Sequence, residues 1–162
     1  MPHRDVTCVL LDFLSQIVAL HREAGKFMNP SGRTSIATIA ALAVLIYWGI
    51  LFLGTHLPGG SQLPFTWFDK VQHASAFAML ALLLLTAISL RVRAGWIATL
   101  TVIGICAVYG LVDELSQQLV PRRTCDFYDW VADVTGSLIG CGIFFAVRAA
   151  WAMLRATQSP TT

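Results

Sequence analysis

Charge is the scarcest property of this 162-residue sequence. Only 12% of the residues are Asp, Glu, Lys or Arg, whereas an average soluble domain carries roughly 25%. Hydrophobic residues make up 56% of the chain. This composition indicates that lipid is the solvent, and the length leaves no room for a separate soluble domain beside several membrane-spanning helices.

Long basic runs, metal-binding spacings and a leader pattern are also missing. The longest basic run is Arg122-Arg123, which excludes nucleic acid as a partner. No cysteine lies in a CxxC or His-linked spacing, so we expect no disulfide framework, no metal and no cofactor. The first 30 residues lack a basic start followed by an apolar core and a small-residue cleavage site. We therefore expect no cleaved signal peptide.

Four apolar stretches are long enough to cross a hydrocarbon layer of about 30 Å. They cover residues 34–54, 72–90, 95–115 and 129–153. None alternates with period 2, and a helix satisfies its own backbone hydrogen bonds in lipid. We therefore predict an all-α integral membrane bundle of four transmembrane helices over residues 31–155, followed by a polar tail over 156–162.

The N-terminal segment, residues 1–30, has two interpretations. Its apolar part is suited to a helix at the membrane interface, although Asp12 and its short length make it a poor span. The alternative is that translation starts at Met28, which begins a short basic leader into the first span. We prefer the interfacial helix.

The positions of Lys and Arg predict the orientation of the bundle. Eight of the 11 basic residues precede the first stretch, separate the second from the third, or lie near the end of the fourth. The other three lie on the opposite side. Because Lys and Arg accumulate in cytoplasmic segments, we expect both termini in the cytoplasm.

Six of the nine acidic residues lie at the predicted outer ends of the second, third and fourth stretches. The orientation brings these three ends to one membrane depth. The acids outnumber the nearby basic residues Lys70, Arg122 and Arg123, so we expect either protonated carboxyls or a bound cation. The six are Asp69, Asp113, Glu114, Asp126, Asp129 and Asp133.

Helical spacing places these polar residues on shared helix faces. Asp69 lies four residues before His73, and Gln117 follows Asp113 and Glu114 by four and three residues. In the fourth stretch one stripe carries two acids and then two glycines, which let a neighbouring helix approach closely. The stripe contains Asp129, Asp133, Gly136 and Gly140.

At these residues the sequence resembles the VanZ-like family of bacterial membrane proteins. The resemblance spans about residues 68–142 and rests on the order and spacing of four motifs. They are Asp69-Lys70-x-x-His73, Tyr109-Gly110-x-x-Asp113-Glu114-x-x-Gln117, Arg122 or Arg123 before Asp126-x-x-Asp129, and Asp133-x-x-Gly136-x-x-x-Gly140. The family often has Asn at the position of Asp133, so this chain carries an additional ionisable group there. The resemblance implies a multi-pass protein of the bacterial inner membrane and a link to glycopeptide resistance, especially toward teicoplanin, without a settled mechanism.

The candidate ligand-binding residues each have a structural alternative. His73 is either a ligand or proton acceptor oriented by Asp69, or an interfacial side chain on a helix capped by Asp69. An arginine of the outer loop either binds a phosphate or carboxylate, or pairs with loop acids while Asp126 or Asp129 begins the last helix. The candidates are Asp69, Lys70, His73, Asp113, Glu114, Gln117, Arg122, Arg123, Asp126, Asp129 and Asp133.

Three functions stay open at this stage. The leading one is binding of a lipid-linked cell-wall precursor or other envelope ligand at the outer face, with membrane lipid as a partner. The second is an enzyme acting on a lipid phosphate or headgroup, with His73 and Glu114 as acid and base candidates, although no nucleophile motif supports it. The third is proton or cation transport through Asp113, Glu114 and Asp133, which would require a homo-oligomer.

Overall fold

The computed structural model describes residues 30–56, 66–121 and 125–157. These residues form four α-helices: α2 (Pro30–His56), α3 (Thr66–Ser89), α4 (Trp96–Gln117) and α5 (Phe127–Thr157). Each helix is long and apolar enough to cross a membrane, and the described ranges contain no strand. The predicted all-α fold with four spanning helices is confirmed. The predicted interfacial helix falls in residues 1–29 and lies outside the described residues.

Helices α2 and α5 extend beyond the predicted limits at both ends, α3 begins before its predicted start at residue 72, and α4 ends after its predicted end at residue 115. Hydropathy marks only the apolar part of a helix, whereas the backbone hydrogen bonds continue into polar turns. Helix α3 begins at Thr66, which places Asp69 within its first turn, so the prediction that Asp69 caps this helix is wrong. Helix α5 begins directly after Asp126, whose Oδ1 accepts a hydrogen bond from the Tyr128 amide at 2.8 Å. Asp126 therefore begins the last helix, as one interpretation of the sequence predicted.

The described residues divide into two units: one lies within residues 35–144, and the other contains residues 30–34 and 145–157. The described part of the second unit consists of the first residues of α2 and the C-terminal turns of α5. In these turns the Arg155 guanidinium lies over the Trp151 ring, 5.1 Å from its centroid.

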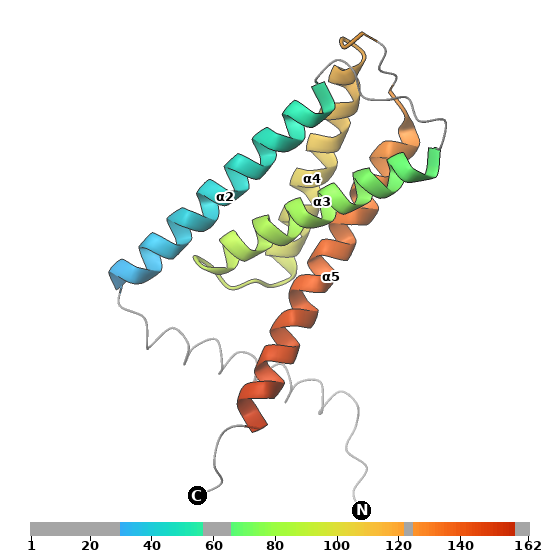
Figure 1. Cartoon of the computed structure of the whole chain (residues 1–162). Helices are drawn as coiled ribbons and strands as arrows, with labels where there is room; N and C mark the ends of the chain where they lie inside the picture. The colour runs from blue at the N-terminus through green and yellow to red at the C-terminus, as the bar shows by residue number, and fades with distance from the viewer. Residues whose placement is uncertain (1–29, 57–65, 122–124, 158–162) are drawn as a thin grey trace, which may run out of the picture. The chain divides into compact units, whose positions relative to one another are not determined.

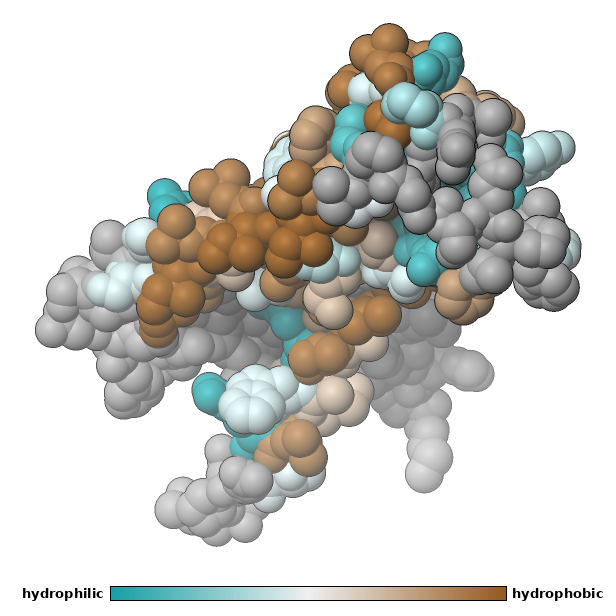
Figure 2. Space-filling model, turned by 45° about the horizontal axis from the view of Figure 1, so that its top comes forward, coloured by the Kyte–Doolittle hydropathy of each residue, from teal (hydrophilic) through white to brown (hydrophobic). Residues whose placement is uncertain are grey.

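The unit of residues 35–144 has an apolar core between its helices. Leu80, Leu85, Val102 and Cys106 are fully buried in it. The outward face of α2 carries exposed aliphatic side chains, including Ile39 and Leu45. Figure 2 shows hydrophobic side chains gathered in a broad band on the face it draws. An apolar core combined with an apolar exterior is the arrangement that a lipid environment stabilises.

Helices α3 and α5 approach each other through two glycines. A Cβ atom at Gly136 would overlap the backbone carbonyl of Ala74, and one at Gly140 would overlap that of Ala78. The predicted role of this glycine pair in close helix packing is therefore confirmed. Because the same stripe of α5 carries Asp129 and Asp133, this packing also turns their carboxylates toward α3.

Within this unit, four helix ends gather in one place. Figure 1 shows the C-terminal ends of α2 and α4 beside the N-terminal ends of α3 and α5. The six acidic residues of the sequence motifs lie on or beside these ends, so the fold assembles the site from segments that are far apart in the chain.

Candidate functional site

Every acidic residue in the described part of the chain lies at this end of the unit. We call it the acidic end, and it is made of Asp69, Asp113, Glu114, Asp126, Asp129 and Asp133. Four of these acids are nearly inaccessible: their exposed fractions are 2% for Asp113 and Glu114, 6% for Asp129 and 0% for Asp133. Burying carboxylates is costly unless each has a charge partner, a proton or strong hydrogen bonds, so their contacts decide what the acidic end can do.

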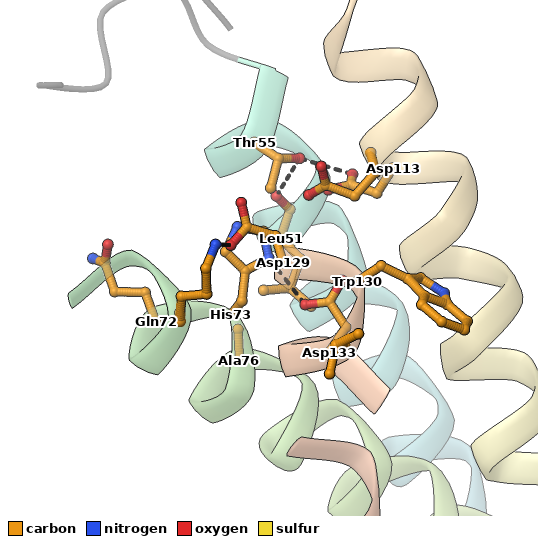
Figure 3. Close-up of polar contacts among 12 residues, drawn as sticks. Leu51, Thr55, Gln72, His73, Ala76, Asp113, Asp129, Trp130 and Asp133 are labelled. Atoms are coloured by element: carbon orange, nitrogen blue, oxygen red, sulfur yellow. Dashed lines mark hydrogen bonds and ion pairs between the residues drawn. The ribbon is translucent and has the colours of Figure 1, made fainter. Parts of the chain in front are cut away.

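The centre of the acidic end is a pair formed by His73 of α3 and Asp133 of α5. His73 Nδ1 lies 2.9 Å from Asp133 Oδ1, and the two side chains are 11% and 0% exposed. Figure 3 shows the two side chains meeting between the helices. Packing of α5 on α3 brings the carboxylate of Asp133 onto the ring, so the described hydrogen bond of His73 goes to Asp133. Orientation of His73 by Asp69 stays a prediction.

Glu114 of α4 completes a cluster with this pair. One nitrogen of His73 and one carboxylate oxygen each of Glu114 and Asp133 lie within 4.8 Å of one another. Glu114 Oε2 also accepts a hydrogen bond from the Asp126 amide at 3.0 Å, which ties α4 to the start of α5. The acid and base candidates chosen from the sequence, His73 and Glu114, are therefore neighbours in the fold.

Lys70 is the counter-ion of the outer part of the acidic end. Its ammonium lies 2.6 Å from Asp126 Oδ2 and 2.5 Å from Asp129 Oδ1. The hydrogen bond from Lys70 holds the pKa of Asp126 below its ordinary value, and the Tyr128 amide acts in the same direction. One lysine thus serves two carboxylates and has no described contact with Glu114 or Asp133.

Asp113 is held by neutral hydrogen bonds. Thr55 Oγ1 donates to its Oδ1 at 2.9 Å and Gln117 Nε2 donates to its Oδ2 at 2.9 Å. In the next turn of α4, Ser116 Oγ lies 2.9 Å from His56 Nε2. Sequence analysis missed Thr55 and His56, because α2 shares no motif with the rest of the site. Their position at the polar end of the first apolar stretch was the only signal.

The remaining sequence candidates are the two loop arginines. Arg122 and Arg123 lie outside the described residues. Among the residues that are described, Lys70, His73 and His56 are the only basic side chains near the six acids. The described part of the acidic end is therefore suited to a cation or to hydrogen-bond donors rather than to an unaccompanied phosphate.

Two groups at the acidic end have the donor atoms of a metal site. The inner group is the cluster of His73, Glu114 and Asp133, and the outer group consists of Asp69, His73 and Asp129, with donor atoms also within 4.8 Å. Each offers one imidazole nitrogen and two carboxylate oxygens, a set that suits divalent metal ions. Sequence spacing did not reveal the inner group, because its three donors come from three helices. In the outer group the spacing paired Asp69 with His73 on α3 but did not reveal Asp129, which lies on α5.

Comparison with known proteins agrees with these features. The family model VanZ/LLP1 matches residues 9–148, which is most of the chain. Searches of curated proteins and of solved structures found no match to this chain. The matched range includes all four polar motifs and all four described helices, α5 up to residue 148. On this match, this four-helix membrane protein belongs to the VanZ/LLP1 family.

Proposed function

We propose that this VanZ/LLP1-family protein binds the polar part of a cell-envelope ligand at its acidic end and thereby influences susceptibility to glycopeptides such as teicoplanin. The observation that carries the proposal is the buried cluster of His73, Glu114 and Asp133, contributed by three helices. A bundle that needed only to be stable in lipid would fill this position with apolar side chains, because buried charges cost free energy.

The charges at the acidic end narrow the chemistry of the ligand. Among the described residues, Lys70 compensates Asp126 and Asp129. The other buried acids are accompanied there only by two histidines and by neutral donors. Hydroxyl, amide and ammonium groups fit such a surface. A lipid-linked cell-wall precursor offers sugar hydroxyls and amides, and its phosphates would require a bridging cation or the arginines of the loop.

An enzyme acting on a lipid headgroup is the second candidate. The proximity of His73 and Glu114 favours it, because a general acid and a general base must reach the same reacting atoms. Under this alternative, His73 takes or gives a proton while Asp133 orients the ring through the contact at Nδ1. Incubation of the purified protein with its copurified lipid distinguishes the candidates, since only an enzyme releases a new product.

Transport is the least supported of the three. The described acids lie in the terminal turns at one end of the helices, and the core beyond them is formed by residues such as Leu80, Leu85 and Val102. The described residues therefore offer no chain of ionisable groups along the bundle, which proton or cation transfer would need.

Two measurements test the proposed function. The full-length protein is extracted with its surrounding lipid, and the bound lipids are compared by mass spectrometry with those of the bulk membrane. We expect enrichment of an envelope lipid, and a profile identical to the bulk would contradict binding.

Expression in a teicoplanin-susceptible bacterium should shift the inhibitory concentration of teicoplanin. Glu114→Gln should abolish this shift. The control variant Gly142→Ala, which has nothing within 4 Å of the added Cβ, should retain it. An unchanged inhibitory concentration would contradict the link to glycopeptides.

A further inference from the structure

The inner cluster contains an oxygen atom that the described residues leave unsatisfied. Asp133 Oδ1 contacts His73, but the other carboxylate oxygen, Oδ2, is buried and has no hydrogen-bond partner in the described part of the chain. A buried acceptor without a partner costs about 1–3 kcal/mol. Such an atom, fully buried between the helices, indicates that something else satisfies it.

This oxygen faces the helix that carries Glu114. A Cβ atom at Gly110 of α4 would lie only 2.7 Å from Asp133 Oδ2, so the glycine leaves the space that the carboxylate occupies. Gly110 and Glu114 are four residues apart and share one face of α4. The free oxygen of Asp133 thus lies on the side of the cluster where the Glu114 carboxylate also lies.

The cluster also carries more negative charge than the described residues neutralise. It contains two buried carboxylates and one imidazole, and the nearby ammonium of Lys70 is already bound to Asp126 and Asp129. A divalent cation would neutralise both carboxylates and satisfy the free oxygen at the same time.

We propose that His73, Glu114 and Asp133 bind one divalent metal ion of the zinc or manganese class. Imidazole nitrogen suits zinc and carboxylate oxygen suits manganese, and both ions bind nitrogen and oxygen donors at about 2.0–2.2 Å. Donors that lie within 4.8 Å of one another reach such an ion with small side-chain rotations. Three protein donors leave coordination positions open for water or for an oxygen of the bound headgroup. Only the contact between the metal and a headgroup oxygen rests on the proposed function. This contact explains how an acidic site would hold a phosphate-bearing ligand.

The outer group of Asp69, His73 and Asp129 is a weaker metal site. The Lys70 ammonium lies 2.5 Å from Asp129 Oδ1, so a metal ion would have to displace it or bind beside a positive charge. Asp69 is exposed and is not forced by burial to find a charge partner. The two groups share only His73, so substitution of the other members tells them apart.

The test uses the full chain in lipid nanodiscs, with Cys8→Ser and Cys125→Ser to remove two thiols that would bind zinc nonspecifically. Bound metal is quantified by equilibrium dialysis with Zn²⁺ and, separately, with Mn²⁺ monitored by its electron paramagnetic resonance signal. We expect one ion per chain. Glu114→Gln and His73→Gln should each weaken binding by at least about 100-fold, the upper end of the loss seen for removal of an outer-sphere partner. Asp69→Asn should leave the affinity unchanged.

Circular dichroism of each variant checks that the helices persist, and wild-type protein should gain thermal stability with added metal while Glu114→Gln does not. Absence of saturable binding in the wild type, or wild-type affinity in folded Glu114→Gln, would overturn the proposal. Loss of binding in Asp69→Asn with retention in Glu114→Gln would assign the metal to the outer group and also overturn it. Absence of saturable metal binding together with copurification of an envelope lipid would refute the metal while leaving the proposed function intact.

Discussion

At the scale of single residues, the acidic end is organised by pairs that cross between helices. His73 and Asp133 are both largely buried, and His73 Nδ1 lies 2.9 Å from Asp133 Oδ1. Removing one member of such a pair leaves a buried charge or acceptor without a partner, whereas removing both does not. This asymmetry distinguishes a true interaction from incidental proximity.

The His73–Asp133 pair yields a prediction for stability in the presence of a chelator. His73→Leu should lower the free energy of unfolding by about 3–5 kcal/mol, because the buried carboxylate of Asp133 then loses its only hydrogen-bond partner among the described residues. The double variant His73→Leu/Asp133→Leu should recover much of this loss. Denaturant titration in detergent micelles, followed by circular dichroism, measures both. A loss in the double variant equal to the sum of the losses in His73→Leu and Asp133→Leu alone would show that the pair does not interact.

Lys70 yields a prediction for pH. Its hydrogen bond lowers the pKa of Asp126, so the ionised form of Asp126 is favoured in the folded protein. The resulting stability is present above the unfolded pKa of about 3.9 and is lost as the pH falls through the lowered folded pKa. Lys70→Met should therefore melt at a lower temperature than wild type at pH 7, and the gap should narrow below about pH 4.

Melting temperatures of both proteins across this range check the prediction. The contribution of Asp126 is modest, because its side chain is 40% exposed to solvent. A gap that stays constant or widens toward acid pH would contradict the assigned role of the lysine.

At the scale of helices, the length of the apolar stretches and the spacing of glycines were the sequence features that predicted the spans and their packing. The sequence predicted all four spans because lipid requires about 20 apolar residues in a row, which few other structures need. It also predicted the packing stripe of α5, because Gly136 and Gly140 lie on one helix face. The helix ends were less accurate, since turns that contain charged residues, such as Thr66–Val71 with Asp69 and Lys70, continue a helix beyond its uninterrupted apolar run.

The packing of α5 on α3 yields a prediction for the glycine stripe. Gly136→Ala should destabilise the protein by about 1–3 kcal/mol, because the new methyl group would overlap the carbonyl of Ala74 and force the helices apart. Gly142→Ala is the matched control on the same helix, where nothing lies within 4 Å. Its effect should be neutral or stabilising by up to about 1 kcal/mol, the helix propensity gained. If the two variants unfold alike, the close approach of α3 and α5 is wrong.

At the scale of the whole molecule, the sequence predicted that the polar motifs converge but could not pair their residues. Which carboxylate contacts His73 depends on the rotation of α5 about its axis, and this is fixed by contacts with α3. For the same reason Thr55 and His56 were overlooked, since their partners lie on α4, about 60 residues further along the chain. The arginines of the outer loop lie outside the described residues, and their role remains a prediction.

Orientation in the membrane yields a prediction at this scale. Cys125 is exposed beside the acidic end, whereas Cys106 and Cys141 are buried. If the acidic end lies on the outer side, as the distribution of Lys and Arg predicts, a membrane-impermeant maleimide should label Cys125 in intact cells of a Cys8→Ser variant. Labelling that requires permeabilisation of the cells would place the acidic end in the cytoplasm.

The central claim is that the buried cluster of His73, Glu114 and Asp133 binds a ligand and does more than hold helices together. The most direct measurement is the amount of envelope lipid that copurifies with wild type, with Glu114→Gln and with Gly142→Ala, each checked for folding by circular dichroism. We predict that wild type and Gly142→Ala retain the lipid and that folded Glu114→Gln loses it. Equal retention by all three proteins would show that the ligand does not bind at the acidic end.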